Sequence, residues 1–469
     1  MISDSDFVRQ LLPELSVQYD KAKSYISDVP TQSLIEFRRL AYGLVTRLSN
    51  HKLSFNSTNL YERIEQLSQT RMIDVPTTRS LHRLRGYANK GAHPEKYHLS
   101  QIQLQALTQK AIKDWLFLLE HLHLKWLRKA APKYQLISHD ATGSRELCYR
   151  AVMEDDHYAQ YLLGMSFKAK GFSFQQQINQ KHSNKTKDEK CKLDKQNLAK
   201  SAYWFSVAAP FYDKALYEHG LALFHGYQGE KQLAEGIKII EQAAKKAVTD
   251  AEALLGYFYL VGSEAIHMDI DKAHHYLTLA AEKEQTEAMS NLGVLYYQQG
   301  KLKKAHHFIA KAARSGFPNA QYHLALMLAS GEGCHQDQSA SEHWLAEAAE
   351  QGQMDAMLDC ARHMLNNEQS LGDDLSQAET YLKLVIEQSN NVTAMLELST
   401  ALVDGSFKRI DVVGAATLLN YAKTFATSSE LNIISHLKTS LLEQIKRVMA
   451  LTKNENEIKT LKQAGQLLN

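Results

Sequence analysis

A helix-pair pattern that recurs seven times constrains this chain more than any other feature of its sequence. From about residue 157 onward, the first helix of each copy carries a small residue and a second small residue five positions later. The seven pairs are Ala159/Gly164, Ala215/Gly220, Ala251/Gly256, Ala288/Gly293, Ala320/Ala325, Ala356/Ala361 and Ala394/Ser399. Because this spacing does not vary, we expect one structural unit to be repeated along the chain.

The second helix of each copy has its own pattern. A small residue is followed three positions later by a large one, and by a small pair at positions seven and eight. The copies are Ser201/Trp204/Ala208-Ala209, Gly236/Ile239/Ala243-Ala244, Ala273/Tyr276/Ala280-Ala281, Ala305/Phe308/Ala312-Ala313, Ser341/Trp344/Ala348-Ala349 and the looser Ala378/Tyr381/Val385-Ile386 and Ala415/Leu418/Ala422-Lys423. These positions share one helix face, where small side chains let neighbouring helices approach closely. The pattern predicts an all-α solenoid, in which each helix pair packs mainly against the next.

Segments 288–316 and 320–352 resemble Sel-one-like repeats, which are relatives of the tetratricopeptide repeat, and the resemblance covers about residues 157–425. It implies a right-handed superhelix whose first helices line a concave face that holds partner proteins. We therefore expect an α/α solenoid at 147–428 and capping helices at 429–469. A polar, lysine-rich insert at 173–197 interrupts the first copy, and we predict that it is disordered; whether it orders on binding is open.

The exposed face of the first helices provides the candidate partner-binding residues. Counted from the first small residue, positions 2, 6 and 9 point away from the second helix. Aromatic residues recur there: Tyr161, Tyr217, Phe224, Tyr257, Tyr297 and Tyr322. Tyrosine is common at binding hot spots, which favours a peptide-binding groove. The alternative is packing between adjacent repeats, and both interpretations can hold for different side chains.

Histidines and cysteines raise the question of a metal site. His275, His307 and His343 occupy the same position in three successive second helices. Adjacent packed helices lie about 10 Å apart, which is too far for these rings to share one ion. Cys334-His335 with Cys360 and His363 matches no known zinc-finger spacing. We therefore expect no metal and no cofactor.

The first 132 residues lack the repeat and predict a separate helical bundle. Apolar residues recur every three or four positions in five stretches, at 6–26, 33–52, 57–70, 77–93 and 99–130. Residues 133–146, which include a Gly-Ser pair and show no clear period, are the expected linker.

This bundle resembles the HEPN superfamily, and within it a domain of otherwise unknown function that also occurs in type I restriction subunits. The resemblance rests on FRRLAYGLVTRL, LYERIEQL and LHRLRGYANKGAH, followed by a long closing helix. HEPN ribonucleases use an arginine and, four to six residues later, a histidine at a dimer interface to cut RNA without a metal. Here seven residues separate Arg85 from His93, or about 12 Å along a straight helix. This spacing favours a structural motif, with a catalytic Arg85/His93 pair as the alternative.

Because this segment is locally basic, a contact with phosphate or nucleic acid is a further alternative. The candidate residues are Arg83, Arg85, Asn89, Lys90 and His93. The whole chain is nearly neutral, with 54 basic and 52 acidic residues, so a general affinity for nucleic acid is not expected. The sequence contains no phosphate-binding loop, dinucleotide fingerprint, nucleophile elbow or zinc-protease motif.

The expected location is the cytoplasm. The N-terminus lacks a secretion signal, no apolar run is long enough for membrane insertion, and four cysteines without a CxxC pair suit a reducing compartment. The sequence thus predicts a cytoplasmic scaffold or adaptor that binds a partner protein of unknown identity through its solenoid. Its N-terminal bundle would form a homodimer or dock a second partner. The alternative is a HEPN-type effector that binds or cleaves RNA in defence or stress response.

Overall fold

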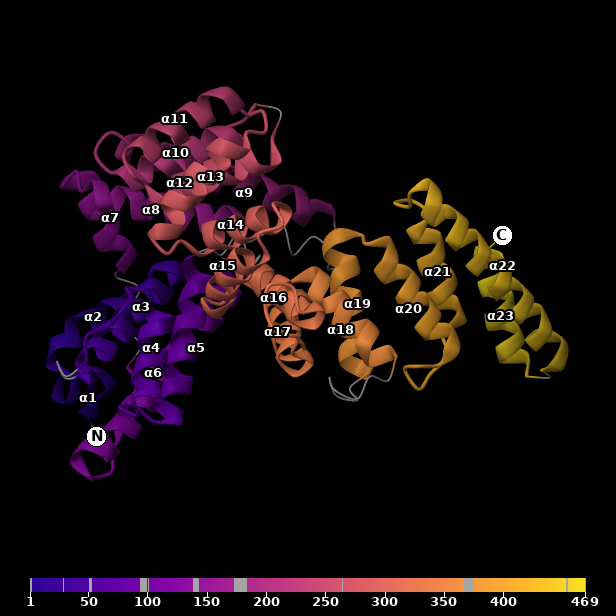
Figure 1. Ribbon diagram of the computed structural model, residues 1–469, viewed down its shortest axis with the longest axis horizontal. Coiled ribbons are helices and arrows are strands. Elements are labelled where there is room, and N and C mark those ends of the chain that lie inside the picture. Colours follow the sequence, from indigo (N-terminus) through magenta and orange to yellow (C-terminus); the bar gives the residue numbers. More distant parts are fainter. Residues whose placement is uncertain are drawn as a thin grey trace. The chain divides into compact units, whose positions relative to one another are not determined.

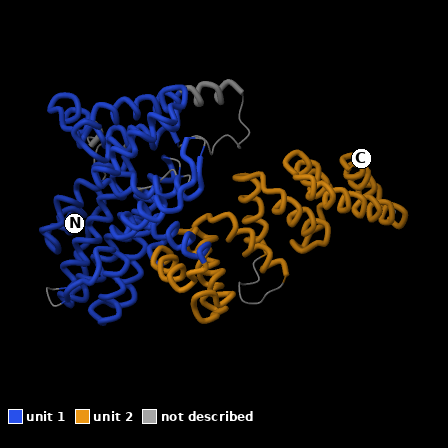
Figure 2. The backbone as a smooth tube through the Cα atoms, turned by 45° about the horizontal axis from the view of Figure 1, so that its top comes forward, with its two compact units in different colours: residues 1–299, 314–316 blue, residues 300–313, 317–469 orange. Residues whose placement is uncertain are grey.

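The structure is a computed structural model. It describes residues 2–27, 29–49, 53–92, 99, 101–137, 143–172, 184–263, 265–366, 375–452 and 454–468. Helices make up nearly all of its regular secondary structure. The chain divides into two compact units: residues 1–299 with 314–316, and residues 300–313 with 317–469 (Figure 2).

The first unit begins with a helical bundle (Figure 1). Its helices are α1 (Asp4–Leu11), α2 (Pro13–Ser24), α3 (Pro30–Leu48), α4 (Leu60–Gln69), α5 (Val75–Ala92) and α6 (Gln101–Leu127). Their apolar faces meet in a core that fully buries Phe7, Phe37 and Trp115. The helical N-terminal region predicted from the three-to-four-residue periodicity is confirmed.

One helix boundary differs from the sequence expectation. The stretch 6–26 is divided at Leu12, which ends α1, and Pro13 is the first residue of α2. Proline has no backbone N–H to continue the hydrogen bonding of α1, but its fixed backbone angle suits the start of a helix.

The beginning of the expected linker is paired with the N-terminus. Strand β1 (Ile2–Ser3) pairs in parallel with β2 (Tyr134–Gln135), and Phe7 stacks on Tyr134 with ring centroids 5.0 Å apart. The backbone N–H of Ile137 donates to the buried carboxylate of Asp4 at 3.0 Å. Residues 134–137 are therefore held against the bundle. Within the expected linker, helix α7 (Gly143–Met153) begins at residue 143.

The repeats of the first unit follow as antiparallel helix pairs. Their helices are α8 (His157–Phe172), α9 (Asn184–Ala208), α10 (Asp213–His225), α11 (Leu233–Lys245), α12 (Thr249–Val261), α13 (Ile270–Glu282) and α14 (Thr286–Gln298). The small residues of the pattern lie at the helix contacts. A Cβ atom on Gly256 would come within 2.7 Å of Leu277, so only glycine fits at this separation of α12 and α13. The predicted all-α solenoid is confirmed.

The insert of the first repeat differs in part from the sequence expectation. Residues 184–197, expected to be disordered, belong to α9. Apolar residues such as Leu198 and Ala202 continue this helix into the repeat, where Ala202 is buried. The remaining insert residues, 173–183, lie outside the described residues.

The second unit contains α15 (Leu302–Arg314) except for its last residue, and then α16 (Pro318–Ser330), α17 (Gln338–Glu350), α18 (Met354–Leu365), α19 (Leu375–Ser389), α20 (Val392–Asp404), α21 (Val412–Ala422), α22 (Ser428–Leu451) and α23 (Glu455–Leu468). Leu441 and Ile445 of α22 and Leu461 of α23 join the apolar core of the preceding helix pairs. In the described part of the chain, no helix is both long and apolar enough to cross a membrane.

Candidate functional site

Arg85, the first residue of the candidate Arg/His pair, lies on α5 and contacts a turn that belongs to the first unit. Its Nη1 donates to the carbonyl oxygen of Ser315 at 2.6 Å, and its guanidinium lies 5.0 Å from the ring centre of Tyr61. Asn89, one helical turn further along α5, donates to the same carbonyl at 3.3 Å. A charged donor on a buried carbonyl is a stabilising contact, and it gives Arg85 a structural role.

The start of α4 adds to this contact. The side-chain oxygen of Asn59 accepts from the N–H of Tyr61 at 2.9 Å and caps α4, while its amide donates to the Ser315 hydroxyl at 2.9 Å. The hydroxyls of Ser57 and Thr58 donate to the two carboxylate oxygens of Glu284, at 2.8 and 2.7 Å. We call this group of hydrogen bonds to Glu284 and Ser315 the bundle–repeat contact.

The bundle–repeat contact reaches turns that precede first helices of the repeats. Glu284 lies two residues before α14, and Ser315 lies three residues before α16. A role for Ser57, Thr58 and Asn59 was not predicted from the sequence. The polar run Asn56-Ser57-Thr58-Asn59 before an apolar helix is a helix-start signal that could have indicated the cap, but nothing in it indicated the partner 226 or more residues away.

The remaining basic residues of the candidate phosphate site do not converge on one point. Arg83 forms an ion pair with Asp114 on α6, with Nε 2.9 Å from the carboxylate. Lys90 is half-buried near the end of α5. His93 lies outside the described residues, so its pairing with Arg85 stays a prediction.

His82 lies next to Arg85, and its environment favours the neutral imidazole. Its Nε2 is 2.9 Å from the Glu65 carboxylate, and its ring packs beside Tyr61. Burial lowers the pKa of His82, the positive charge of Arg85 lowers it further, and Glu65 opposes both effects.

The aromatic residues predicted to bind a partner fall into two groups. In the first unit, Tyr161 packs against Tyr212 with centroids 5.0 Å apart, Phe224 stacks on Phe258 at 5.1 Å, and Tyr217 packs on the core around α11 and α12. In the second unit, the hydroxyl of Tyr322 donates to Asp359 at 2.9 Å. These four side chains contribute to the packing of the repeats.

Tyr257 of α12 and Tyr297 of α14 form the other group. Their side chains are 43% and 42% exposed, although both lie on first helices and Tyr297 occupies the repeat position that the packed Phe224 occupies in α10. Their helices contact each other directly. These two residues supply exposed aromatic area on adjacent first helices.

Charged groups accompany the aromatic residues of α8, α10 and α12. Lys168 and Glu218 form a buried ion pair at 2.9 Å, with side chains 6% and 9% exposed. Burial raises the pKa of Tyr217 well above its ordinary value, and the charges of Asp250 and Glu218 raise it further. The tyrosine hydroxyl therefore stays protonated and available as a hydrogen-bond donor.

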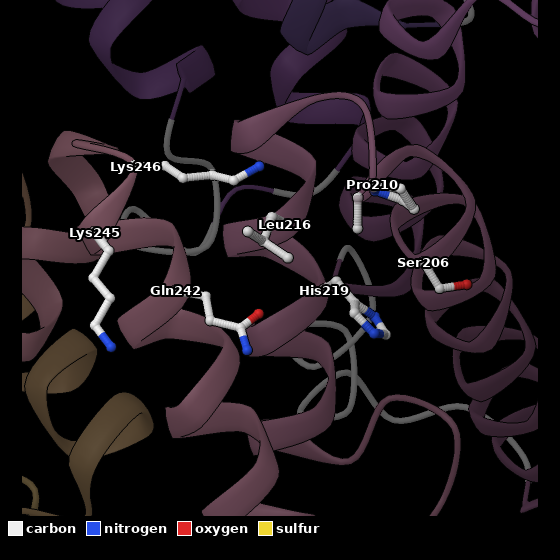
Figure 3. A pocket seen from close by; sticks show the side chains of 8 residues that line it. Ser206, Pro210, Leu216, His219, Gln242, Lys245 and Lys246 are labelled. Carbon is white, nitrogen blue, oxygen red and sulfur yellow. The ribbon is translucent and has the colours of Figure 1, made fainter.

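A pocket of about 580 Å³ lies among α9, α10 and α11 (Figure 3). Its lining residues are Ser206, Ala209, Pro210, Leu216, His219, Gln242, Lys245 and Lys246. Lys246 is paired with Asp213 at 2.8 Å, and burial lowers the pKa of His219. On α10, His219 and Tyr217 point to nearly opposite sides of the helix, so this pocket is separate from the aromatic row.

Within the described residues, no three histidine, cysteine or acidic side chains are grouped closely enough to hold a metal ion. Cys360 is buried, and burial raises the pKa of its thiol to about 12, which disfavours the thiolate that zinc requires. The rings of His275, His307 and His343 are exposed.

Comparison with protein families finds separate matches for the N-terminal helices and for the repeats. Residues 20–139 match a family described as a domain of unknown function, DUF4145. The Sel1 repeat family matches residues 213–248, 249–284, 286–317 and 318–353.

Two curated proteins resemble parts of the chain. The chitin synthase regulator SKT5 of Saccharomyces cerevisiae is 27% identical over 151 residues, which are 31% of this chain and 21% of that protein. A putative sel1-like repeat-containing protein, L21, of Acanthamoeba polyphaga mimivirus is 32% identical over 87 residues, 19% of this chain and 16% of that protein. The chain thus spans no more than about a fifth of the length of either relative.

Solved structures of similar repeat proteins include two bacterial examples. A Sel1 repeat protein from Oxalobacter formigenes is 22% identical and covers 66% of this chain and 98% of its own, with a TM-score of 0.44. The protective antigen c5321 of uropathogenic Escherichia coli is 17% identical and covers 93% of this chain and 94% of its own, with a TM-score of 0.39. The chain thus carries Sel1 repeats at residues 213–353 and, before them, a helical region whose residues 20–139 match the unknown-function family DUF4145.

Proposed function

We propose that this protein is a scaffold or adaptor that binds a partner protein on the concave face of its repeats. The observation that carries the proposal is the exposure of Tyr257 and Tyr297 on adjacent first helices. The other four aromatic side chains predicted on this face are packed, whereas these two leave 43% and 42% of their area open to solvent. A tyrosine ring buries a large area at low entropic cost when a partner covers it.

The bundle–repeat contact supports a scaffold role for the N-terminal domain. Arg85 and Asn89 bind the Ser315 carbonyl, so the LRGYANK segment ties the bundle to the turns of the repeats. A fixed bundle can present a second surface, either for a homodimer or for docking another protein. We also propose the domain division at 132, 146 and 428, and a HEPN-like ancestry for the bundle, on the sequence pattern alone.

We place this activity in the cytoplasm. Cys148, Cys334 and Cys360 are free thiols in the structure, and free thiols persist in a reducing compartment. The alternative function, an RNA-binding or RNA-cleaving effector, has its support in the basic residues around Arg85. The engagement of Arg85 with a backbone carbonyl favours the scaffold.

The test is an affinity purification of the full chain, with bound protein and RNA identified by mass spectrometry and sequencing. The Tyr257→Ala/Tyr297→Ala variant should lose at least one partner that the wild type retains. Tyr203→Ala is the matched control, because Tyr203 is 56% exposed on the second helix α9. Identical partners for all three proteins would exclude a groove centred on these tyrosines. RNA cleavage by the wild type that His93→Ala abolishes would establish the effector function instead.

A further inference from the structure

The outer face of α6, on the N-terminal bundle, carries a row of exposed apolar and basic side chains, which we call the α6 seam. At 100° per residue, Lys110, Lys113, Phe117 and Leu124 fall within an arc of about 60° on this helix. The opposite face of α6 is buried in the bundle core through Trp115, Leu118, Leu119 and Leu122. The seam is therefore the solvent side of an amphipathic helix that is already fixed in place.

The apolar part of the seam is exposed. Phe117, Leu124 and Leu127 have exposed fractions of 56%, 56% and 55%. They follow a heptad spacing, with steps of seven and three residues, which is the spacing at which one helix packs along another. More than half of each of these residues is therefore open to solvent.

The basic part of the seam lies on the N-terminal side of Phe117. Lys110 and Lys113 continue the same heptad positions, and Arg128 follows Leu127 at the end of the helix. Within the described residues, these three side chains form no ion pair. Asp114 is paired with Arg83, and Glu120, which lies between Lys113 and Leu127 at the same heptad position, accepts from the hydroxyl of Tyr134. With three basic side chains and one carboxylate, the seam carries a net positive charge, which is concentrated at Lys110 and Lys113.

We propose that the α6 seam docks an amphipathic helix of a partner protein that is acidic at one end and apolar at the other. Carboxylates of that helix would face Lys110 and Lys113, and its leucine-type side chains would cover Phe117, Leu124 and Leu127. The 18 residues from Lys110 to Leu127 extend about 26 Å, which a partner helix of about 18 residues matches. Charge complementarity then sets the register of the two helices.

Other occupants fit the seam less well. A second copy of the chain would place Lys110, Lys113 and Arg128 against the same basic seam, where like charges oppose association. A lipid surface would require Lys110 and Lys113, which share the arc of Phe117 and Leu124, to approach the acyl region together with these side chains. Nucleic acid would leave Phe117, Leu124 and Leu127 without an apolar partner.

A direct test uses the full chain and a fluorescein-labelled synthetic helix of 21 residues. This probe has glutamates at its first heptad positions and leucines at its last, and fluorescence anisotropy reports its binding. We expect a Kd on the order of 10 µM. Lys110→Glu/Lys113→Glu and Leu124→Ser should each weaken binding by about 10-fold or more. A second peptide with lysines in place of the glutamates should bind the Lys110→Glu/Lys113→Glu variant better than the wild type.

The matched control is Lys231→Glu/Lys238→Glu, which makes the same charge change at two exposed lysines of the second repeat and should leave binding unchanged. A control peptide has the same composition as the probe, but its glutamates and leucines are moved off the heptad positions; equal binding of this peptide would overturn the proposal. No binding of the probe to the wild type at 500 µM, about 50 times the expected Kd, would also overturn it. A dimer that Leu124→Ser converts to a monomer, or full competition by RNA or by phosphatidylserine vesicles, would also overturn it. This inference rests on the docking role proposed for the bundle. The Tyr257→Ala/Tyr297→Ala variant should not change probe binding, so a negative result for the repeat groove can be distinguished from a negative result for the α6 seam.

Discussion

Replacing Gly236 with alanine should destabilise the second repeat, although alanine is the better helix former. Gly236 is buried in the first turn of α11. In an exposed helix the exchange of glycine for alanine gains about 1 kcal/mol. A Cβ atom on Gly236, however, would lie 2.7 Å from the backbone nitrogen of Phe224 and 2.8 Å from the carbonyl oxygen of Gly220.

Both of these atoms belong to the backbone of α10, so a change of side-chain rotamer cannot relieve the contact. The two helices must move apart, and overpacking of this kind costs about 1–3 kcal/mol. Because two backbone contacts are violated, we take the upper part of that range. The expected net loss in the free energy of unfolding is about 1–2 kcal/mol.

Gly86→Ala is the matched control. Gly86 is also helical, on α5, but a Cβ atom there would meet nothing within 4 Å. This variant should gain about 0.5–1 kcal/mol.

Urea unfolding followed by circular dichroism measures both effects, and hydrogen exchange locates them. In Gly236→Ala, amides of α10 and α11 should exchange faster while those of α1 to α6 stay unchanged, because each repeat packs mainly against its neighbours. Gly236→Ala as stable as the wild type, or more stable, would refute the close-packing explanation of the small-residue pattern.

The bundle–repeat contact and one carboxylate provide two further predictions. Arg85→Ala removes a charged donor from the Ser315 carbonyl, so the backbone amides of residues 315–317 should exchange hydrogen about 10-fold faster or more. Arg83→Ala is the control and should leave these exchange rates unchanged. Equal exchange rates in the two variants would contradict the contact. At Glu379, hydrogen bonds from Arg409 and then Lys383 lower the pKa from 4.5 to about 2. The carboxylate therefore stabilises the fold above about pH 4.5, and this contribution is lost as the pH falls toward 2. The stability difference between wild type and Glu379→Gln should be constant above about pH 5 and vanish near pH 2, and a pH-independent difference measured by urea unfolding would disprove the assignment.

The repeat architecture could be predicted because its signal is local and is repeated. Ala251 and Gly256 show the reason: a fixed five-residue spacing of small side chains is a direct consequence of close helix packing. The same regularity predicted which aromatic positions share a face. The pattern could not show which of these side chains are exposed: Phe224 stacks on Phe258, whereas Tyr257 is 43% exposed.

The break at Pro13 shows a different limit. The apolar periodicity runs through this residue, and the single missing N–H that ends α1 is a backbone effect that periodicity does not register. The pairing of Ile2 with Tyr134 was also beyond the sequence pattern, since two-residue strands carry too little pattern to be recognised.

The sequence by itself determined the solenoid, the separate helical bundle and the row of aromatic residues, since each follows from spacings within a few helical turns. Tertiary structure decided the role of Arg85. Its partner, the Ser315 carbonyl, is 230 residues away and is a backbone atom, so no side-chain pattern could indicate it. It also decided which apolar side chains remain exposed, Tyr257 and Tyr297 on the repeats and Phe117 on α6, because exposure depends on what every other segment of the chain covers.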